Sequence, residues 1–161
     1  MAELAQFAET LPSHAKRKGF RCVVARETTT GQIIGFAYGY ACQPGQWWHD
    51  TVANAMGKER AAEWLSDCFE FVELAVMPIM QGYGIGGRLH DALMAGVLYR
   101  TAMLSTYQGD TSAMQLYRKR GWTPLIEDFV YPSDDPTGDK PFVIMGLKLH
   151  SSSYGEPWQA A

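Results

Sequence analysis

Glycines gather in one short stretch of this chain, at Gly82, Gly84, Gly86 and Gly87. The run before them, residues 69–76, has the aromatic and β-branched content of a buried strand, and the apolar residues after them recur at helical spacing. Backbone N–H groups at a helix start have no intrahelical partners, and glycines, which lack Cβ, let an anion approach them closely. The stretch therefore predicts a site for the diphosphate of a negatively charged cofactor.

Three of these glycines, Gly82, Gly84 and Gly87, also spell G-x-G-x-x-G, the fingerprint of dinucleotide-binding sheets. That fingerprint directly follows its strand, whereas residues 77–81 intervene here, and only one further helix pattern follows in the chain. Asp110 lies at a tolerable distance for the acidic residue of that motif but precedes a helix pattern. The spacing disfavours a nicotinamide dinucleotide, and a turn that only caps a helix stays as a third interpretation.

A different pattern, Q-x-x-G-x-G beginning at Gln81, follows Leu-Ala-Val-x-Pro at residues 74–78. This segment resembles the acetyl-coenzyme A signature of the GNAT superfamily of N-acetyltransferases. Downstream, residues 110–122 are similar to a second motif of that family, with a cap, an alanine, a Leu-Tyr pair and a Gly-aromatic pair on one helix. Together the two motifs cover residues 69–125, and two motifs in the family's order are far more specific than one.

The resemblance implies that acetyl-coenzyme A is the cofactor. Loop amides would hold its diphosphate, and a backbone N–H near Ala75 or Val76 would stabilise the tetrahedral oxyanion. The residues that this interpretation assigns to the cofactor are Leu74, Ala75, Val76, Gln81, Gly82, Tyr83, Gly84, Ile85, Gly86, Gly87, Asp110 and Ala113.

The second motif also makes sense as an ordinary helix. Asp110 suits its N-cap, Gly121 suits the position after its end, and Tyr117 could be a core aromatic. The resemblance implies a further role for Tyr117, because in such enzymes this tyrosine commonly points at the cofactor sulfur. There it can return a proton to the departing thiolate.

Two carboxylates, Glu70 and Glu73, lie in the strand that, by resemblance, runs beside the thioester. Because side chains alternate along a strand, the two are expected on opposite faces. Glu70 matches the position where several acetyltransferases carry an acid or histidine that accepts the amine proton, and Glu73 is the second choice. Either could instead be a partly solvated carboxylate at a sheet margin.

A long segment, residues 42–67, separates the predicted hairpin from this strand and carries two helical patterns. Trp47, Trp48 and His49 within it are candidates for binding the acceptor, since tryptophans give large, stiff contact area around a ligand. The alternatives are that these residues close the core or form a subunit interface, and His49 alone is more typical of a structural histidine. The acidic residues of the segment would suit a cationic amine: Asp50, Glu59, Glu63 and Asp67.

The elements that must position these groups follow from periodicity. We predict a helix over residues 4–18 and another after residue 110, besides the helix that the glycines open. Strands are predicted over residues 20–26, 33–40, 69–76, 102–106, 123–130 and 142–149. The fold class is α/β (α+β), a mixed, mostly antiparallel twisted sheet flanked by helices. The resemblance implies the GNAT fold with a shortened N-terminus, whose usual first strand is either absent or supplied by a partner chain, so a homodimer is possible.

Length and composition indicate one domain over residues 1–150 and a C-terminal tail over residues 151–161. The formal net charge is -3, and no basic run suggests nucleic acid. No apolar stretch is long enough for a membrane span and the N-terminus lacks signal-peptide features, so a cytoplasmic location is expected. The three cysteines are widely spaced, which predicts reduced thiols and no metal site.

These features together predict an N-acetyltransferase. It would move the acetyl group of acetyl-coenzyme A directly to a primary amine of a small molecule or peptide, without a covalent enzyme intermediate. A non-catalytic acyl-coenzyme A sensor or partner module is the first alternative. A dinucleotide-binding protein is the second.

Overall fold

The computed structural model describes residues 2–132 and 140–149, and the side chains from residue 8 onward. Its helices are α1 (Ala2–His14), α2 (Trp47–Met56), α3 (Lys58–Leu65), α4 (Ile85–Met94) and α5 (Ser112–Lys119), with a 3-10 turn η1 (Pro78–Met80). Its strands are β1 (Arg21–Arg26), β2 (Ile33–Cys42), β3 (Cys68–Val76), β4 (Thr101–Tyr107), β5 (Thr123–Phe129) and β6 (Phe142–Lys148). The predicted tail over residues 151–161 lies outside the described residues.

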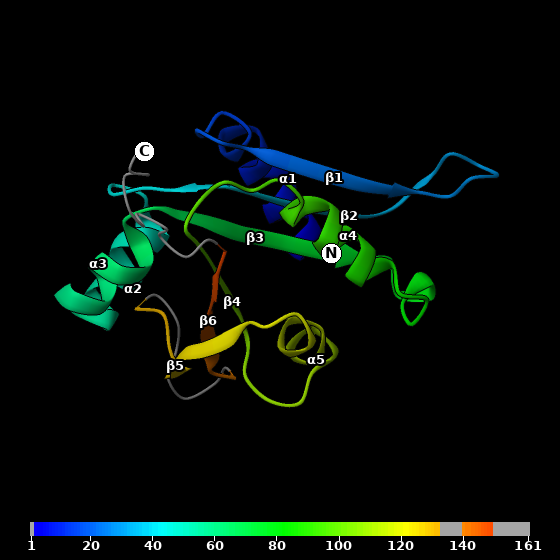
Figure 1. Ribbon diagram of the computed structural model, residues 1–161. Coiled ribbons are helices and arrows are strands. Elements are labelled where there is room, and N and C mark those ends of the chain that lie inside the picture. The colour runs from blue at the N-terminus through cyan, green and yellow to red at the C-terminus, as the bar shows by residue number, and fades with distance from the viewer. Residues whose placement is uncertain (1, 133–139, 150–161) are drawn as a thin grey trace, which may run out of the picture.

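The six strands form one sheet in the order β1-β2-β3-β4-β6-β5 (Figure 1). Only β3 and β4 pair in parallel, and the other four neighbouring pairs are antiparallel. The predicted mixed, mostly antiparallel sheet is thereby confirmed. A dinucleotide-binding sheet is mostly parallel, so this topology excludes it.

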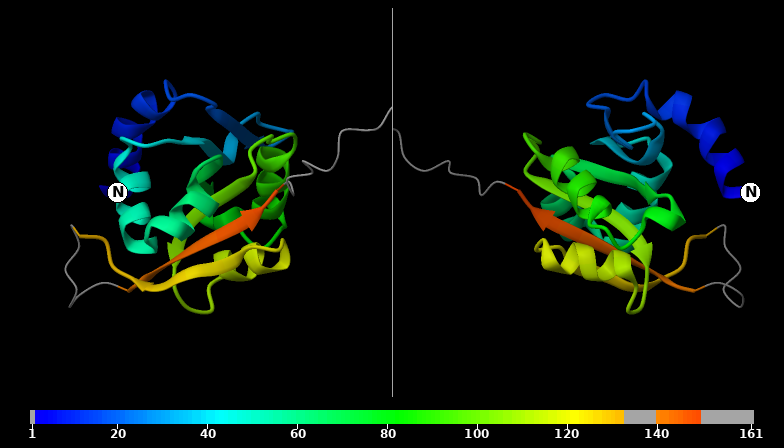
Figure 2. Two further views of the ribbon diagram at one scale, coloured as in Figure 1. Left: turned by 60° about the vertical axis from the view of Figure 1, so that its left-hand side comes forward. Right: turned by 90° about the vertical axis from the view of Figure 1, so that its right-hand side faces the viewer.

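Helices cover both faces of the sheet (Figure 2). In both views of Figure 2, α4 and α5 lie on one face, and α1 lies on the other together with α2 and α3. The α4 and α5 face holds a core that includes Leu89, Leu93 and Met114, and a second core under α2 and α3 includes Val52 and Met103. No helix among the described residues has the length and apolar character needed to cross a membrane.

Strand β2 places small residues on one face of the sheet and aromatic residues on the other. Gly35 and Gly39 point toward the α4 face, where a Cβ on Gly35 would lie 3.1 Å from Leu89 Cδ1. At Gly39 a Cβ would overlap the ring of Phe69. The glycines thus let β2 pack closely there. The aromatic residues of β2 that alternate with these glycines face α1.

A β-bulge at Val72 changes the facing of β3. Tyr38 pairs with Glu73 and Gly39 pairs with Phe71, so Val72 has no partner on β2. An extra residue reverses the alternation along a strand. The sequence-based expectation that Glu70 and Glu73 lie on opposite faces is therefore wrong, since both lie on the face that carries α1.

Strands β3 and β4 separate soon after they meet. Their pairing covers only three positions and ends at Glu70 and Met103. Beyond that point the two strands diverge: in Figure 1, β3 runs across the picture and β4 runs downward at a steep angle to β3. The remainder of each strand therefore presents an edge toward an opening between them.

The N-terminus of α5 is capped by Thr111, whose Oγ1 accepts a hydrogen bond of 3.1 Å from the Met114 backbone N–H. The prediction that Asp110 is the cap is wrong by one residue. Its carboxylate instead accepts a 3.0 Å hydrogen bond from the Gln115 side chain. A threonine in the extended conformation is an equally good cap, and the sequence could not rank the two neighbours.

Candidate active site

Two cavities lie at the opening between β3 and β4. The strand cavity, of about 620 Å³, is lined by Thr10, His14, Phe36, Tyr38, Phe71, Val72, Glu73, Leu74, Ala75, Ser105, Thr106, Tyr107, Ala113, Tyr117 and Phe142. The loop cavity, of about 570 Å³, is lined by Leu74, Val76, Met80, Gln81, Gly82, Gly84, Ile85, Gly86, Gly87, Ser112, Ala113 and Leu116. Leu74 and Ala113 belong to both linings, so the cavities adjoin. An elongated ligand could occupy the two together.

The loop cavity is built by the glycine stretch that the sequence singled out. Gly84 is the N-cap of α4 in the left-handed conformation, with φ of 79°. The first helical hydrogen bond runs from the Arg88 N–H to the Gly84 carbonyl, so the amides of Ile85, Gly86 and Gly87 precede it. Amides in this first turn have no intrahelical acceptor and lie at the positive end of the helix dipole. The cavity is suited to an anionic group.

The path of the chain into this loop explains its spacing. The 3-10 turn η1 occupies the residues between β3 and the glycines, and the Gln81 side chain donates a 3.1 Å hydrogen bond back to the Val76 carbonyl. At Gly82 and Gly84 a Cβ would meet no atom within 4 Å. Tyr83 is 75% exposed and, like Asp110, lines neither cavity.

Tyr117 lines the strand cavity and is 6% exposed. Its ring packs edge-on against Phe71 and Trp122, with centroids 5.9 Å apart in each pair. Burial, followed by the nearby charge of Glu73, raises the pKa of the Tyr117 hydroxyl. The group therefore stays protonated at neutral pH and can serve as a proton donor.

Hydrogen bonds between α4 and the end of α5 support the part of the cavity wall that Tyr117 forms. The Trp122 indole N–H donates a 3.0 Å hydrogen bond to His90 Nε2, and His90 Nδ1 lies 2.9 Å from Asp91. Since Nε2 accepts, Nδ1 carries the proton and donates to the carboxylate. Arg120 donates to the same carboxylate at 2.7 Å, and its guanidinium holds the pKa of Asp91 at about 2. The two motif helices are thereby fixed to each other.

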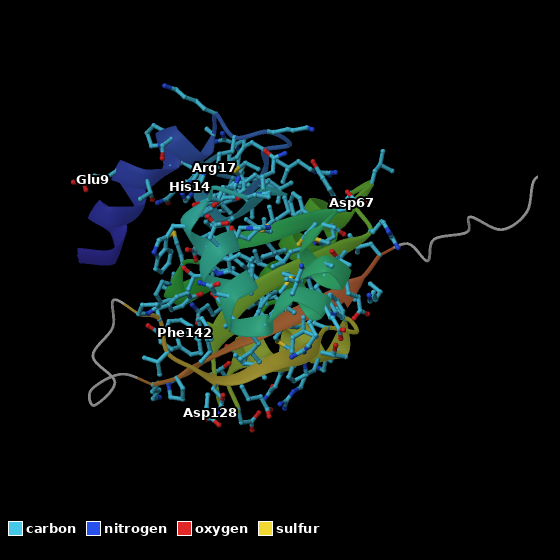
Figure 3. The ribbon with its side chains drawn as sticks, turned by 90° about the vertical axis from the view of Figure 1, so that its left-hand side faces the viewer. Glu9, His14, Arg17, Asp67, Asp128 and Phe142 are labelled. Carbon is cyan, nitrogen blue, oxygen red and sulfur yellow. The ribbon has the colours of Figure 1, made fainter. Side chains whose placement is uncertain are left out.

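The opposite wall of the strand cavity comes from α1 and β2, which sequence reasoning did not assign to the site. His14 Nδ1 lies 3.0 Å from the Tyr38 hydroxyl, and Arg17 donates a 2.5 Å hydrogen bond to Tyr40. Figure 3 shows His14 and Arg17 together at the end of α1 and Phe142 lower on the same side of the molecule. The alternating aromatics Phe36, Tyr38 and Tyr40 were the available signal.

Glu70 is buried on the same face of the sheet as α1 and lines neither cavity. It is 4% exposed, and its Oε2 atom has no hydrogen-bond partner among the described residues. Burial raises the pKa of the Glu70 carboxyl to about 7, while a hydrogen bond from Tyr40 and the charge of Arg17 oppose that rise. Glu73, by contrast, faces the strand cavity directly.

The raised pKa predicts that Glu70 costs stability at high pH. The rise from 4.5 to about 7 means that its contribution is fully present below pH 4.5 and is lost as pH approaches 7. That rise corresponds to about 3 kcal/mol of unfolding free energy. The free energy of unfolding, measured by urea denaturation, should fall on going from pH 5 to pH 8. We expect this fall to be smaller for Glu70→Gln than for the unmodified chain.

The matched control for that experiment is Glu59→Gln, which removes an exposed carboxylate from α3. Its loss of unfolding free energy between the two pH values should equal that of the unmodified chain. If Glu70→Gln also kept that loss unchanged, Glu70 would not be the buried acid that its surroundings imply.

The predicted acceptor residues of the insertion lie elsewhere. Trp47 stacks on Tyr131 with centroids 5.5 Å apart, and the Trp48 indole donates a 2.9 Å hydrogen bond to the Tyr131 hydroxyl. His49 is buried, with Nδ1 2.8 Å from Asp50. None of the three insertion residues lines either cavity. Trp48 and Tyr131 pack with the core beneath α2 and α3, whereas Trp47 is largely exposed.

Within residues 2–132 and 140–149, no group of three or more histidine, cysteine, aspartate or glutamate side chains is placed to hold a metal ion.

Sequence comparison finds relatives of known type. The model of the Acetyltransferase (GNAT) family matches residues 2–122. The chain is 30% identical over 166 residues to the GCN5-like protein acetyltransferase Rv2170 of Mycobacterium tuberculosis, an alignment that covers 84% of this chain and 78% of that protein.

Solved structures share the fold. The ribosomal-protein-S18-alanine N-acetyltransferase from Escherichia coli matches with a TM-score of 0.63 and 19% identity, over 93% of this chain and 81% of that one. A GNAT family acetyltransferase from Elizabethkingia anophelis, solved with acetyl-CoA bound, matches with a TM-score of 0.57 and 18% identity, over 88% and 82%. The extent of the family match and the 30% identical relative lead to one conclusion: this chain belongs to the Acetyltransferase (GNAT) family.

Proposed function

We propose that this chain transfers the acetyl group of acetyl-coenzyme A directly to a primary amine within a ternary complex. The observation that carries this proposal is the separation of β3 and β4 beyond Glu70 and Met103. Two adjoining cavities lie at this opening, one lined by the first turn of α4 and the other by the buried Tyr117, and together they would form the proposed site. Family membership supports the same reaction class.

The cofactor would span both cavities. The amides of the first turn of α4 would hold the diphosphate, and the chain of the cofactor would run along the unpaired edge of β3 toward the strand cavity. The Elizabethkingia anophelis relative, solved with acetyl-CoA bound, supports this choice of cofactor. A backbone N–H near Ala75 or Val76 is the proposed donor to the oxyanion.

The reaction needs two proton movements. The neutral amine nitrogen attacks the thioester carbonyl carbon, and collapse of the tetrahedral intermediate breaks the C–S bond. The Tyr117 hydroxyl donates its proton to the departing thiolate, and the amide product releases the extra amine proton to a carboxylate. The raised pKa of Tyr117 keeps its hydroxyl protonated before the transfer.

Two carboxylates could accept the amine proton, and the bulge at Val72 brings both to one face. Glu73 lines the strand cavity and is the proposed contact for the amine. Glu70 has a pKa of about 7, which suits a proton acceptor near neutral pH, but a relay would have to link it to the cavity. We therefore propose that Glu73 contacts the acceptor amine and accepts its proton. The buried Glu70 is the alternative proton acceptor.

The alternative function is an acyl-coenzyme A sensor that binds the cofactor without turning it over. Incubation with acetyl-coenzyme A and a panel of amines, including a lysine peptide, separates the two functions. We expect free coenzyme A thiol and acetylated amine to appear in equal amounts and only when both substrates are present. Cofactor binding without acetylation of any amine would instead favour the sensor.

A further inference from the structure

We propose that the acceptor is a primary amine whose neighbouring carbons carry no carboxylate or other anionic group. This inference rests on the proposed function and narrows its substrate class. It follows from the charges and rings that line the strand cavity, because the described lining holds a carboxylate and aromatic rings but no lysine or arginine.

Among residues 2–132 and 140–149, no lysine or arginine lines the strand cavity. The chain has 14 lysine and arginine residues, and all of them fall within residues 2–132 and 140–149 that the structure describes. None of these cations lines that cavity. The segments outside the described ranges contain no lysine or arginine in the sequence, so they have none to add.

The nearest basic groups are committed to other partners. Arg17 donates to the Tyr40 hydroxyl and lies 4.7 Å above the Tyr40 ring. His14 lines the cavity, but burial and then the charge of Arg17 lower its pKa, which favours the neutral ring at neutral pH. A substrate carboxylate entering the cavity would therefore lose its hydration without gaining a positive partner.

The groups that are present favour a cation. Glu73 lines the cavity together with two aromatic pairs. Phe36 stacks with Tyr38, with centroids 6.5 Å apart, and Tyr107 stacks with Phe142 at 4.6 Å. Aromatic faces attract ammonium groups, and a carboxylate attracts them more strongly. The same Glu73 charge would repel a carboxylate on the carbon next to the amine.

Two sources share this acceptor chemistry: the side-chain amine of a lysine within a polypeptide, and a small aliphatic or arylalkyl amine. Tyramine and tyrosine form a matched pair, since they differ only in the carboxylate next to the amine. A peptide with a blocked N-terminus and one lysine represents the polypeptide source. Relative kcat/KM values for the peptide and for tyramine then tell which source the site prefers.

We expect kcat/KM for tyramine to exceed that for tyrosine by on the order of 100-fold, because like charges placed side by side strongly disfavour binding. Glu73→Gln should raise KM for tyramine and reduce this preference, while acetyl-coenzyme A affinity stays unchanged. Glu59→Gln, which removes a carboxylate outside the cavity, should leave kcat/KM and the preference unchanged. Retention of the full preference by Glu73→Gln would overturn the role of Glu73 in selecting the acceptor.

The outcomes separate this inference from the proposed function. Acetylation of tyrosine as efficient as that of tyramine would overturn the inference and leave acetyl transfer to amines intact. Acetylation of neither tyramine, tyrosine nor the lysine peptide, with acetyl-coenzyme A still bound, would overturn the proposed function and the inference with it.

Discussion

Replacing Tyr117 by Phe is expected to lower kcat by about 100-fold to 1000-fold, within the range that a positioned general acid contributes. The substitution removes only the hydroxyl and keeps the ring that packs against Phe71 and Trp122. Folding and acetyl-coenzyme A affinity should therefore stay close to those of the unmodified chain. Steady-state kinetics with saturating acceptor, together with a cofactor titration, measure both quantities.

Tyr99→Phe is the matched control, because it deletes a tyrosine hydroxyl outside both cavities. Its kcat should equal that of the unmodified chain. Turnover by Tyr117→Phe as fast as that of Tyr99→Phe would remove Tyr117 from the mechanism. A loss confined to KM for the cofactor would make it a binding residue instead.

The second large effect is expected at Gly84, where a bulky side chain should abolish acetyl-coenzyme A binding. A Cβ there would meet no protein atom within 4 Å, and Gly84 lines the loop cavity. A leucine at this position would therefore project beside the space that the diphosphate needs. We expect Gly84→Leu to raise the dissociation constant of acetyl-coenzyme A by at least about 100-fold, and calorimetric titration would measure it. Closure of an anion site formed by several backbone amides would account for that loss.

A leucine at Gly84 could act through backbone strain or by obstructing the diphosphate site, and Gly31 provides the control that separates the two effects. Its φ of 71° is close to the 79° of Gly84, and a Cβ on it would also meet nothing within 4 Å. Each leucine variant should lose a similar free energy of unfolding, about 1–2 kcal/mol, because a leucine must then adopt the left-handed backbone conformation. Only Gly31→Leu should still be stabilised thermally by acetyl-coenzyme A. Equal cofactor affinity in the two variants would contradict the assignment of the loop.

The parts of the site that one local segment determines could be predicted from the sequence. The glycine loop and the start of α4 follow from strand content, glycine spacing and helical periodicity within residues 69–97. Tyr117 was predicted from the resemblance of residues 110–122 to the family's second motif, which occupies a single helix. In each case the chemistry depends on neighbours in the chain, which the sequence displays directly.

The facing of Glu70 and Glu73 could not be predicted. Alternation along β3 is a sound rule, but one residue, Val72, bulges out of the pairing with β2 and reverses it. Nothing in the local sequence marks that position, since a bulge depends on the register between two strands. The consequence is large, because it brings both carboxylates to the face that carries α1.

Residues from distant elements were also beyond prediction. His14 comes from α1 and Phe142 from the start of β6, and only the folded sheet brings them to one cavity. The size of Trp47 and Trp48 and their place in an insertion suggested contact with a ligand. In the structure they contact Tyr131 instead. Composition alone cannot tell an aromatic lid from an aromatic core.

The distance between the Tyr117 hydroxyl oxygen and the coenzyme A sulfur tests the central claim most directly. A crystal structure of the chain with coenzyme A bound would measure it. We expect the sulfur within hydrogen-bond reach of that hydroxyl, at the strand cavity, and the diphosphate on the amides of Ile85, Gly86 and Gly87. A sulfur remote from Tyr117, or a diphosphate outside the loop cavity, would contradict the account of acetyl transfer between β3 and β4.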